Sequence, residues 1–283
     1  MRKISILYKP ILGLAYMCGI FDAASQQVKL ERKNFLNDFV FKGNHIQFSY
    51  STLANFKAGL NRKSGDHPVS TNMAPGFLIS FKYSVNFNNE YSFITGPETM
   101  ILGRNFITSF NKNDFSPPLT KNYELRGANS YLGTLVISLP LLLEKRWIYA
   151  KTKFFIVNTG LRLNVSTGAD FDVFSILLLN TNNGFYNAGE VDVYANNDAK
   201  PWVSFPVNAS HSWLLKNNNL LQLSICSNIS FTKYVNGTYQ IVIPNKPLTS
   251  GQYSSTGTFV GLSFIYVFTN ANYRIRKAYE KNG

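Results

Sequence analysis

The sequence predicts an all-β protein: a closed antiparallel up-and-down transmembrane β-barrel of about eight strands, preceded by an N-terminal signal peptide. Two observations support this prediction. Apolar and polar residues alternate over segments longer than ordinary strands, and the connections between these segments alternate between short and long. Composition agrees, because the 283-residue chain is 45% hydrophobic and 15% aromatic but only 15% charged, whereas soluble domains contain about 25% charged residues.

The first 25 residues have the composition of an export signal. A basic start at Arg2 and Lys3 is followed by an apolar stretch, Ile11–Phe21, and by the small residues Ala23–Ser25. This order is what a signal peptidase recognises, so we expect the mature chain to begin near Gln26. The alternative is a short buried helix.

The clearest strand is Phe77–Phe87, where every odd position is apolar and the even positions are nearly all small or polar. A period of two places the two sets on opposite faces of a strand. A tilted strand needs about 9–11 residues to cross a bilayer, whereas soluble strands usually have about 5–6. Seven further strands follow the same pattern: Asn44–Phe56, Tyr91–Phe106, Ser130–Leu143, Thr152–Val165, Trp202–Leu215, Leu220–Phe231 and Thr258–Phe268.

Two single prolines and one Gly-Pro pair interrupt the strand pattern. Pro140 and Pro206 lie inside expected strands, where a proline loses one ladder hydrogen bond, so we expect a bulge or a strand end at each. Gly96 and Pro97 interrupt the third strand.

The connections fall into two groups by length. The short ones are Asn88–Glu90, Glu144–Lys151 and Lys216–Asn219, and the long ones are Lys57–Pro75, Thr108–Asn129, Ser166–Pro201 and Thr232–Gly257. Short turns on one side and long loops on the other are typical of outer-membrane barrels. We therefore expect four regions, namely a signal peptide (1–25), a periplasmic segment (26–43), the barrel (44–269) and a basic C-terminal tail (270–283).

The bilayer offers an open sheet edge no hydrogen-bond partners, so the sheet must close, and an eight-stranded barrel is filled by its own side chains. No wide pore is expected. Lys82, Glu98 and Arg162 fall on inward faces, and Lys82 and Glu98 lie diagonally across neighbouring strands. The sequence predicts a lumen ion-pair cluster of these three residues, with Asn86 and Asn158 nearby. The alternative is a proton or ion path.

The formal net charge is +13, but the basic residues are scattered instead of forming one stripe. This argues against nucleic-acid binding and is consistent with a surface that faces anionic headgroups. We recognise no metal-ligand cluster, phosphate-binding glycine loop or GxSxG motif, so no catalytic, cofactor or metal site is predicted. Asp66 and His67, in a long loop, would serve the alternative of a lipid-modifying outer-membrane enzyme, although Pro68 after them is typical of a turn.

Three stretches carry a family resemblance. They are the pair Leu135–Leu143 and Lys153–Leu163, the pair Tyr234–Tyr239 and Ser250–Gly251, and the closing segment Gly261–Phe268. Together they resemble the outer-membrane β-barrel proteins of Bacteroidetes, a group that includes the PorT-like barrels. The resemblance implies an integral outer-membrane location. For the PorT-like members in particular it implies a role in secretion.

The closing segment is also similar to the signal read by the barrel-assembly machinery, through Gly261, Phe264, Tyr266 and Phe268. Its aromatic residues share one face and would add to that machinery as an edge strand. The segment departs from the usual pattern at Phe259, where a polar residue is common, and in the tail that follows Phe268.

These observations favour a barrel without enzymatic activity that is structural or docks ligands or partners through its long loops. Long loops carry recognition more often than the scaffold does, and the largest one contains five aromatic residues: Phe171, Phe174, Phe185, Tyr186 and Tyr194. Expected partners are outer-membrane lipid, the barrel-assembly machinery and other envelope or secretion proteins. Another alternative is a secreted soluble barrel resembling a lipocalin, with its apolar residues inside.

Overall fold

The computed structural model describes residues 40–114, 123–125, 131–150, 152–167, 171–181, 184–196 and 200–282. Within them the chain is almost entirely antiparallel β-structure, and the prediction of a closed all-β barrel is confirmed. The predicted signal peptide and most of the segment 26–43 lie outside the described residues.

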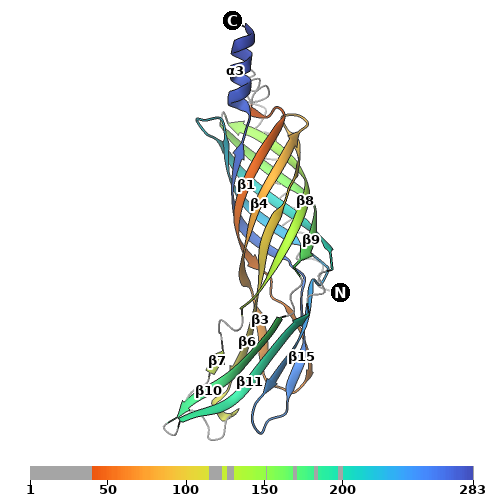
Figure 1. The fold of residues 1–283 in the computed structure, drawn as a ribbon, viewed down its shortest axis with the longest axis vertical. Helices are drawn as coiled ribbons and strands as arrows, with labels where there is room; N and C mark the ends of the chain where they lie inside the picture. The colour runs from red at the N-terminus through yellow and green to blue at the C-terminus, as the bar shows by residue number, and fades with distance from the viewer. Residues whose placement is uncertain are drawn as a thin grey trace.

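The barrel closes because its first strand has two partners. β1 (Asn44–Asn55) pairs along its length with β4 (Ala74–Asn86) on one side and with β16 (Phe259–Phe268) on the other. The next place in the ring is filled by two consecutive strands, β5 (Tyr91–Thr95) and β6 (Glu98–Phe110), which both pair with β4 on one side and with β8 (Tyr131–Ala150) on the other. From β8 the ring continues through β9 (Lys153–Ser166), β12 (Trp202–Leu214) and β13 (Leu220–Ile229) back to β16. Figure 1 shows these tilted strands as the upper body of the molecule.

The barrel wall has an apolar outer face and a polar inner face. Along β1 buried residues alternate with exposed ones up to Leu53; the exposed ones include Phe48, while the inward Ser49 and Ser51 are buried. Phe81 on β4 is 55% exposed and Phe264 on β16 is 60% exposed. This orientation is the reverse of a lipocalin-like barrel, so the soluble alternative does not fit.

The expected turn at Glu144–Lys151 is wrong, because β8 continues to Ala150. Its charged residues suggested a turn, but Glu144 and Arg146 are buried on the inner face, and the alternation continues through them. Charge at the end of a strand is therefore compatible with a barrel whose interior is polar.

The expected bulge or strand end at Pro140 is also wrong. Pro140 pairs with Arg162 in a register that stays constant from Val136 to Ile148. On its other side, β8 pairs with β6 up to Ser138 and with β5 from Leu141. Pro140 therefore faces the Gly96–Pro97 interruption, where a missing N–H removes no ladder bond. Gly96 has φ +146°, and a Cβ there would lie 2.4 Å from the carbonyl oxygen of Phe81.

Pro206 is accommodated in a similar way. It pairs with Asn228 on β13 without a change of register. Toward β9, the paired positions stop at Ser204 and resume at Val207 with the register preserved. The strand loses local pairing on one side only, so the expected bulge is replaced by a short gap.

The long connections form a second β-layer beyond one end of the barrel. Five strands pair in the order β10 (Phe171–Thr181), β11 (Gly184–Asn196), β14 (Val235–Val242), β15 (Thr249–Ser255) and β2 (Gly59–Ser64). We call this the loop sheet. The far end of β6, with β3 (Val69–Asn72) and β7 (Tyr123–Leu125), extends the barrel wall toward it, and a 3-10 turn covers Lys112–Asp114. In Figure 1 these strands form the lower body.

An apolar core joins the loop sheet to the barrel mouth. It brings Leu102 and Phe259 from the barrel together with Val193, Tyr239 and Ile241 from the loop sheet. Phe106 and Tyr239 contact each other with ring centroids 5.3 Å apart. Buried apolar area of this kind is the main favourable term in folding, so the long connections are packed structure.

The short-turn end is closed by a second, smaller core. Phe41 packs edge-on against the inward Phe154, with ring centroids 5.2 Å apart, and Val40, Ile156 and Ala271 belong to the same cluster. Helix α3 (Ala271–Asn282) starts here and projects away from the barrel, so most of the expected basic tail is helical (Figure 1). Among the described residues, no helix has the length and apolarity needed to cross a membrane.

Because the outer wall is apolar, replacing a mid-wall side chain by a cation should destabilise the barrel. We expect Phe81→Lys to lower the free energy of unfolding by about 2–4 kcal/mol in lipid vesicles, whereas the same change at Phe231, which lies just beyond β13 at the loop end and is 80% exposed, should cost about 0–1 kcal/mol. Urea titration of both variants measures this difference. Equal losses at the two positions would contradict a membrane-facing wall.

Candidate functional site

The structure brings Lys82, Glu98 and Arg162 together in the lumen. Ser80 on β4 is opposite Glu98 on β6, which puts Lys82 on the diagonal. Lys82 Nζ lies 2.8 Å from Glu98 Oε1, and Arg162 Nε lies 2.7 Å from Glu98 Oε2. One buried carboxylate is therefore shared by two cations from two other strands.

Arg162 extends this network toward the loop end. Its Nη1 donates to Asn228 Oδ1 at 2.9 Å, and Asn228 Nδ2 donates to the carbonyl oxygen of Gly257 at 3.0 Å. The guanidinium also lies 5.7 Å from the ring centroid of Phe259. The central ion pairs are thus linked to the segment that leaves the loop sheet.

The lumen around this network is nearly filled. Asn158 accepts a hydrogen bond from Asn208 at 2.5 Å. The remaining cavity has a volume of about 20 Å³, and its lining includes Lys82, Glu98 and Arg162 as well as Asn158. That volume is enough for about one water molecule. With apolar clusters at both ends, the interior resembles a packed core more than a channel.

Asn86 does not belong to this network. It accepts a hydrogen bond from Arg146 Nη2 and donates to the carbonyl oxygen of Gly43 at 2.5 Å. Arg146 Nε also pairs with Glu144 Oε1 at 2.7 Å. Sequence reasoning missed this second polar network, although Glu144 and Arg146, two residues apart, must share a face if the strand continues.

The residues of the predicted assembly signal lie on the closing strand β16. Phe264 and Phe268 are exposed on the outer face and Tyr266 is half-buried there. Gly261 points inward, where a Cβ would lie 2.3 Å from the carbonyl oxygen of Thr52.

The five aromatic residues of the largest loop lie on the hairpin β10–β11. Phe171 and Phe174 are on β10, while Phe185, Tyr186 and Tyr194 are on β11. Tyr194 is 37% exposed. The side chains of the other four lie outside the described residues.

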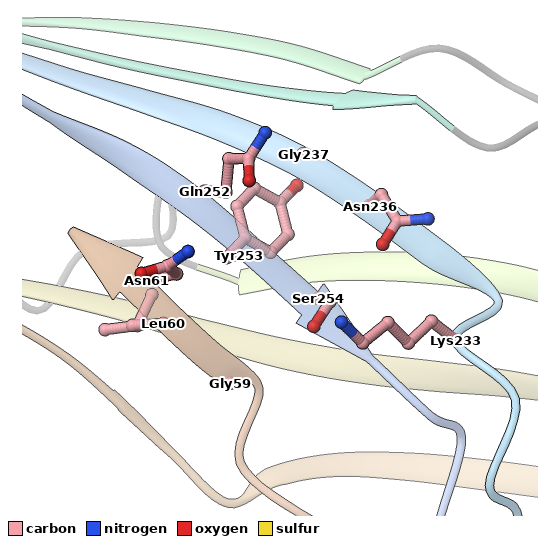
Figure 2. A pocket seen from close by; sticks show the side chains of 9 residues that line it. All are labelled: Gly59, Leu60, Asn61, Lys233, Asn236, Gly237, Gln252, Tyr253 and Ser254. Carbon is pink, nitrogen blue, oxygen red and sulfur yellow. The ribbon is translucent and has the colours of Figure 1, made fainter. Parts of the chain in front are cut away.

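The loop sheet also carries a surface pocket of about 480 Å³. Figure 2 shows its lining, which comes from β2, β14 and β15 and from Lys233 before β14. Polar side chains come from five of the nine lining residues, Asn61, Lys233, Asn236, Gln252 and Ser254, and the others are Gly59, Leu60, Gly237 and Tyr253. The pocket offers amide and hydroxyl groups of the kind that bind polar ligands.

Asp66 and His67 do not form a recognisable catalytic arrangement. Asp66 is exposed, whereas His67 is buried with its Nε2 3.0 Å from Thr108 Oγ1. A catalytic site needs a nucleophile and a base within reach of each other. In the part of the chain that the structure describes, no group of three or more histidine, cysteine, aspartate or glutamate side chains could hold a metal ion.

The closed sheet and its apolar outer face place this protein in the class of transmembrane β-barrels. No family model matches the chain, and no curated protein matches it. Among solved structures it is similar to the outer membrane protein OprG from Pseudomonas aeruginosa, with 8% identity, coverage of 80% of this chain and 96% of that one, and a TM-score of 0.39. It is also similar to an outer membrane channel from Pseudomonas putida F1, with 10% identity, the same coverages and a TM-score of 0.25.

Removing the lumen carboxylate should destabilise the barrel, because it leaves two buried cations without their counterion. We expect Glu98→Gln to lower the free energy of unfolding by about 3–5 kcal/mol. The matched control is Glu280→Gln, which removes an exposed partner of Arg276 on α3 and should leave stability unchanged. Denaturant titration in detergent tests this, and a Glu98→Gln protein as stable as the control would show that the ion pairs are dispensable.

Proposed function

We propose that this protein is an integral outer-membrane β-barrel without enzymatic activity that docks a ligand or partner through its loop sheet. The observation that supports this best is that the barrel and the loop sheet have different kinds of surface. The barrel offers lipid an apolar wall and its lumen is nearly filled, whereas the loop sheet presents a surface pocket with several polar side chains and the exposed Tyr194. Recognition is therefore assigned to the part of the chain beyond the barrel.

The hairpin β10–β11 is the proposed recognition element. It is an edge of the loop sheet, because β11 is the one strand among the described residues that pairs with β10. An edge strand has unpaired backbone groups that another chain's strand can add to. Its sequence contains Phe171, Phe174, Phe185 and Tyr186, and aromatic residue types are enriched at interfaces.

We also propose how the chain reaches the membrane. The signal peptide at 1–25 would direct export, and the β16 residues Gly261, Phe264, Tyr266 and Phe268 would engage the barrel-assembly machinery. The alternating outward aromatic residues of β16 support this role. The resemblance to Bacteroidetes barrels of the PorT-like group makes other secretion proteins the proposed partners, and outer-membrane lipid surrounds the wall.

The proposed outer-membrane location predicts that the loop sheet faces the cell exterior and that α3 faces the periplasm. In a Cys226→Ser background, a membrane-impermeant maleimide should label Gln252→Cys on the loop sheet in intact cells, and should label Arg276→Cys on α3 only after the cells are broken. Both positions are exposed, so accessibility to the reagent, not burial, decides the result. Labelling of Arg276→Cys alone in intact cells would reverse the proposed topology.

Docking is tested by removing the recognition element and leaving the barrel intact. Replacing residues 171–196 by a short Gly-Ser linker should preserve heat-modifiable migration on gels, because β9 and β12 pair with each other directly. An envelope protein that co-purifies with the wild-type chain should then be lost. The control replaces Phe231 by Ala outside the loop sheet. Retention of every co-purifying envelope protein in the linker variant would reject docking through this hairpin.

A further inference from the structure

A buried cation lies at the junction between the barrel mouth and the loop sheet. Arg104 is on β6, beyond the ion-pair region, and is only 3% exposed. Its Nε and Nη1 atoms have no hydrogen-bond partner, and none of the ion pairs among the described residues includes it. A charged group taken out of water in this way is unfavourable unless an opposite charge compensates it.

Two buried phenols lie near this guanidinium. Arg104 Cζ is 5.8 Å from the ring centroid of Tyr234, and Trp202 stacks on the same ring at 5.1 Å. Tyr253 is 4% exposed and belongs to the same apolar core. The hydroxyl groups of both tyrosines are buried without a hydrogen-bond partner.

Tyr253 is available as a hydrogen-bond donor at neutral pH. Burial raises the pKa of Tyr253 to about 12, although the nearby positive charge of Arg104 opposes that rise. Tyr253 therefore keeps its proton under physiological conditions and can donate it in a hydrogen bond. One cation and two hydroxyl groups are thus buried in the same region with unused hydrogen-bonding capacity.

The local backbone keeps this place open for Tyr253. Gly237 is directly opposite Tyr253 in the pairing of β14 with β15. A Cβ at Gly237 would lie 2.3 Å from Tyr253 Cε1, so any larger residue would displace the ring. Glycine at this point allows the phenol to lie against the strand.

We propose that Arg104, Tyr234 and Tyr253 form a binding site for a small oxyanion, a phosphate or a carboxylate. An oxyanion would neutralise the guanidinium and accept from the N–H and O–H groups that otherwise have no partner, and such charge-assisted bonds are the stronger ones in proteins. Buried unsatisfied polar groups call for such an explanation.

The surface pocket adjoins this site through one shared residue. Tyr253 is one of its lining residues and is near the centre of the group drawn in Figure 2. Lys233, beside Tyr234 in the chain, lines the same pocket and would attract an anion toward it. The anion can be free or can be the charged end of a sugar that enters through the pocket. This proposal does not depend on docking through β10–β11.

Calorimetric titration of the purified full-length chain in detergent, at constant ionic strength, tests the site. Inorganic phosphate or acetate should give saturable binding, and glucose 6-phosphate distinguishes a sugar-linked phosphate from a free one. Arg104→Gln should weaken binding by about tenfold or more, as expected for loss of a charge-assisted contact. Tyr253→Phe, which keeps the ring, should weaken it by a smaller factor.

Arg276→Gln, on α3 at the other end of the molecule, is the matched control for loss of an arginine and should bind as the wild type does. If Arg104→Gln does not fold, as judged by heat-modifiable migration, the comparison of Tyr253→Phe with the wild type decides. The proposal is wrong if none of the three anions binds saturably, or if the folded site variants bind as tightly as the control. Binding of acetate alone assigns the site to carboxylates.

Discussion

The rest of this structure depends on pairing every backbone N–H and C=O group in the barrel wall. Hydrocarbon offers these groups no partner, so a sheet in a bilayer must close on itself. Here closure is made by β1, which pairs with β16 over ten residue positions and with β4 over twelve. The chain therefore brings its first and last strands together, although more than 200 residues separate them in sequence. Contacts of such long range are slow to form.

Closure with only eight strands determines how much space the barrel interior has. A ring of eight leaves room for side chains and little else, so polar residues that face inward must satisfy each other. Glu98 does this with Lys82 and Arg162, and Arg146 does it with Glu144 and Asn86. The two networks lie at different depths, and apolar clusters at each end shield them from bulk water. A lumen of this kind holds neighbouring strands in register through charge as well as through backbone bonds.

Much of this could be predicted from the sequence because alternation is a local property. The period of two in Phe77–Phe87 located β4, and the diagonal relation of Lys82 to Glu98 followed from the short turn at Asn88–Glu90. The loop sheet could not be found in this way. Its strands β2, β14 and β15 are short and rich in glycine and polar residues, and β2 is separated from β15 by about 190 positions. Their pairing depends on where the barrel strands that precede and follow them end in space.

At Pro140, local sequence reasoning predicted an irregularity that the structure does not have. Its sequence context alone indicates a broken strand, whereas its neighbour across the sheet, at Gly96–Pro97, has already given up the bond that Pro140 cannot make. Two irregularities that seem independent in sequence are thus one feature in space. A rule about single residues fails here because the relevant hydrogen bond belongs to a pair of strands.

Among the described residues, buried cations outnumber buried carboxylates. The buried charged side chains of the described residues comprise four cations, Lys82, Arg104, Arg146 and Arg162, and only two carboxylates, Glu98 and Glu144. Within the barrel, Arg162 shares Glu98 with Lys82, donates one hydrogen bond to Asn228 and lies over the ring of Phe259. Among the described residues, the contact found for Arg104 is with the ring of Tyr234, and an aromatic ring stabilises a cation by less than a full opposite charge does. An interior that is positive at the boundary between membrane and loop sheet therefore favours an anion, and it does so where the chain changes from a sealed barrel to a surface open to solvent.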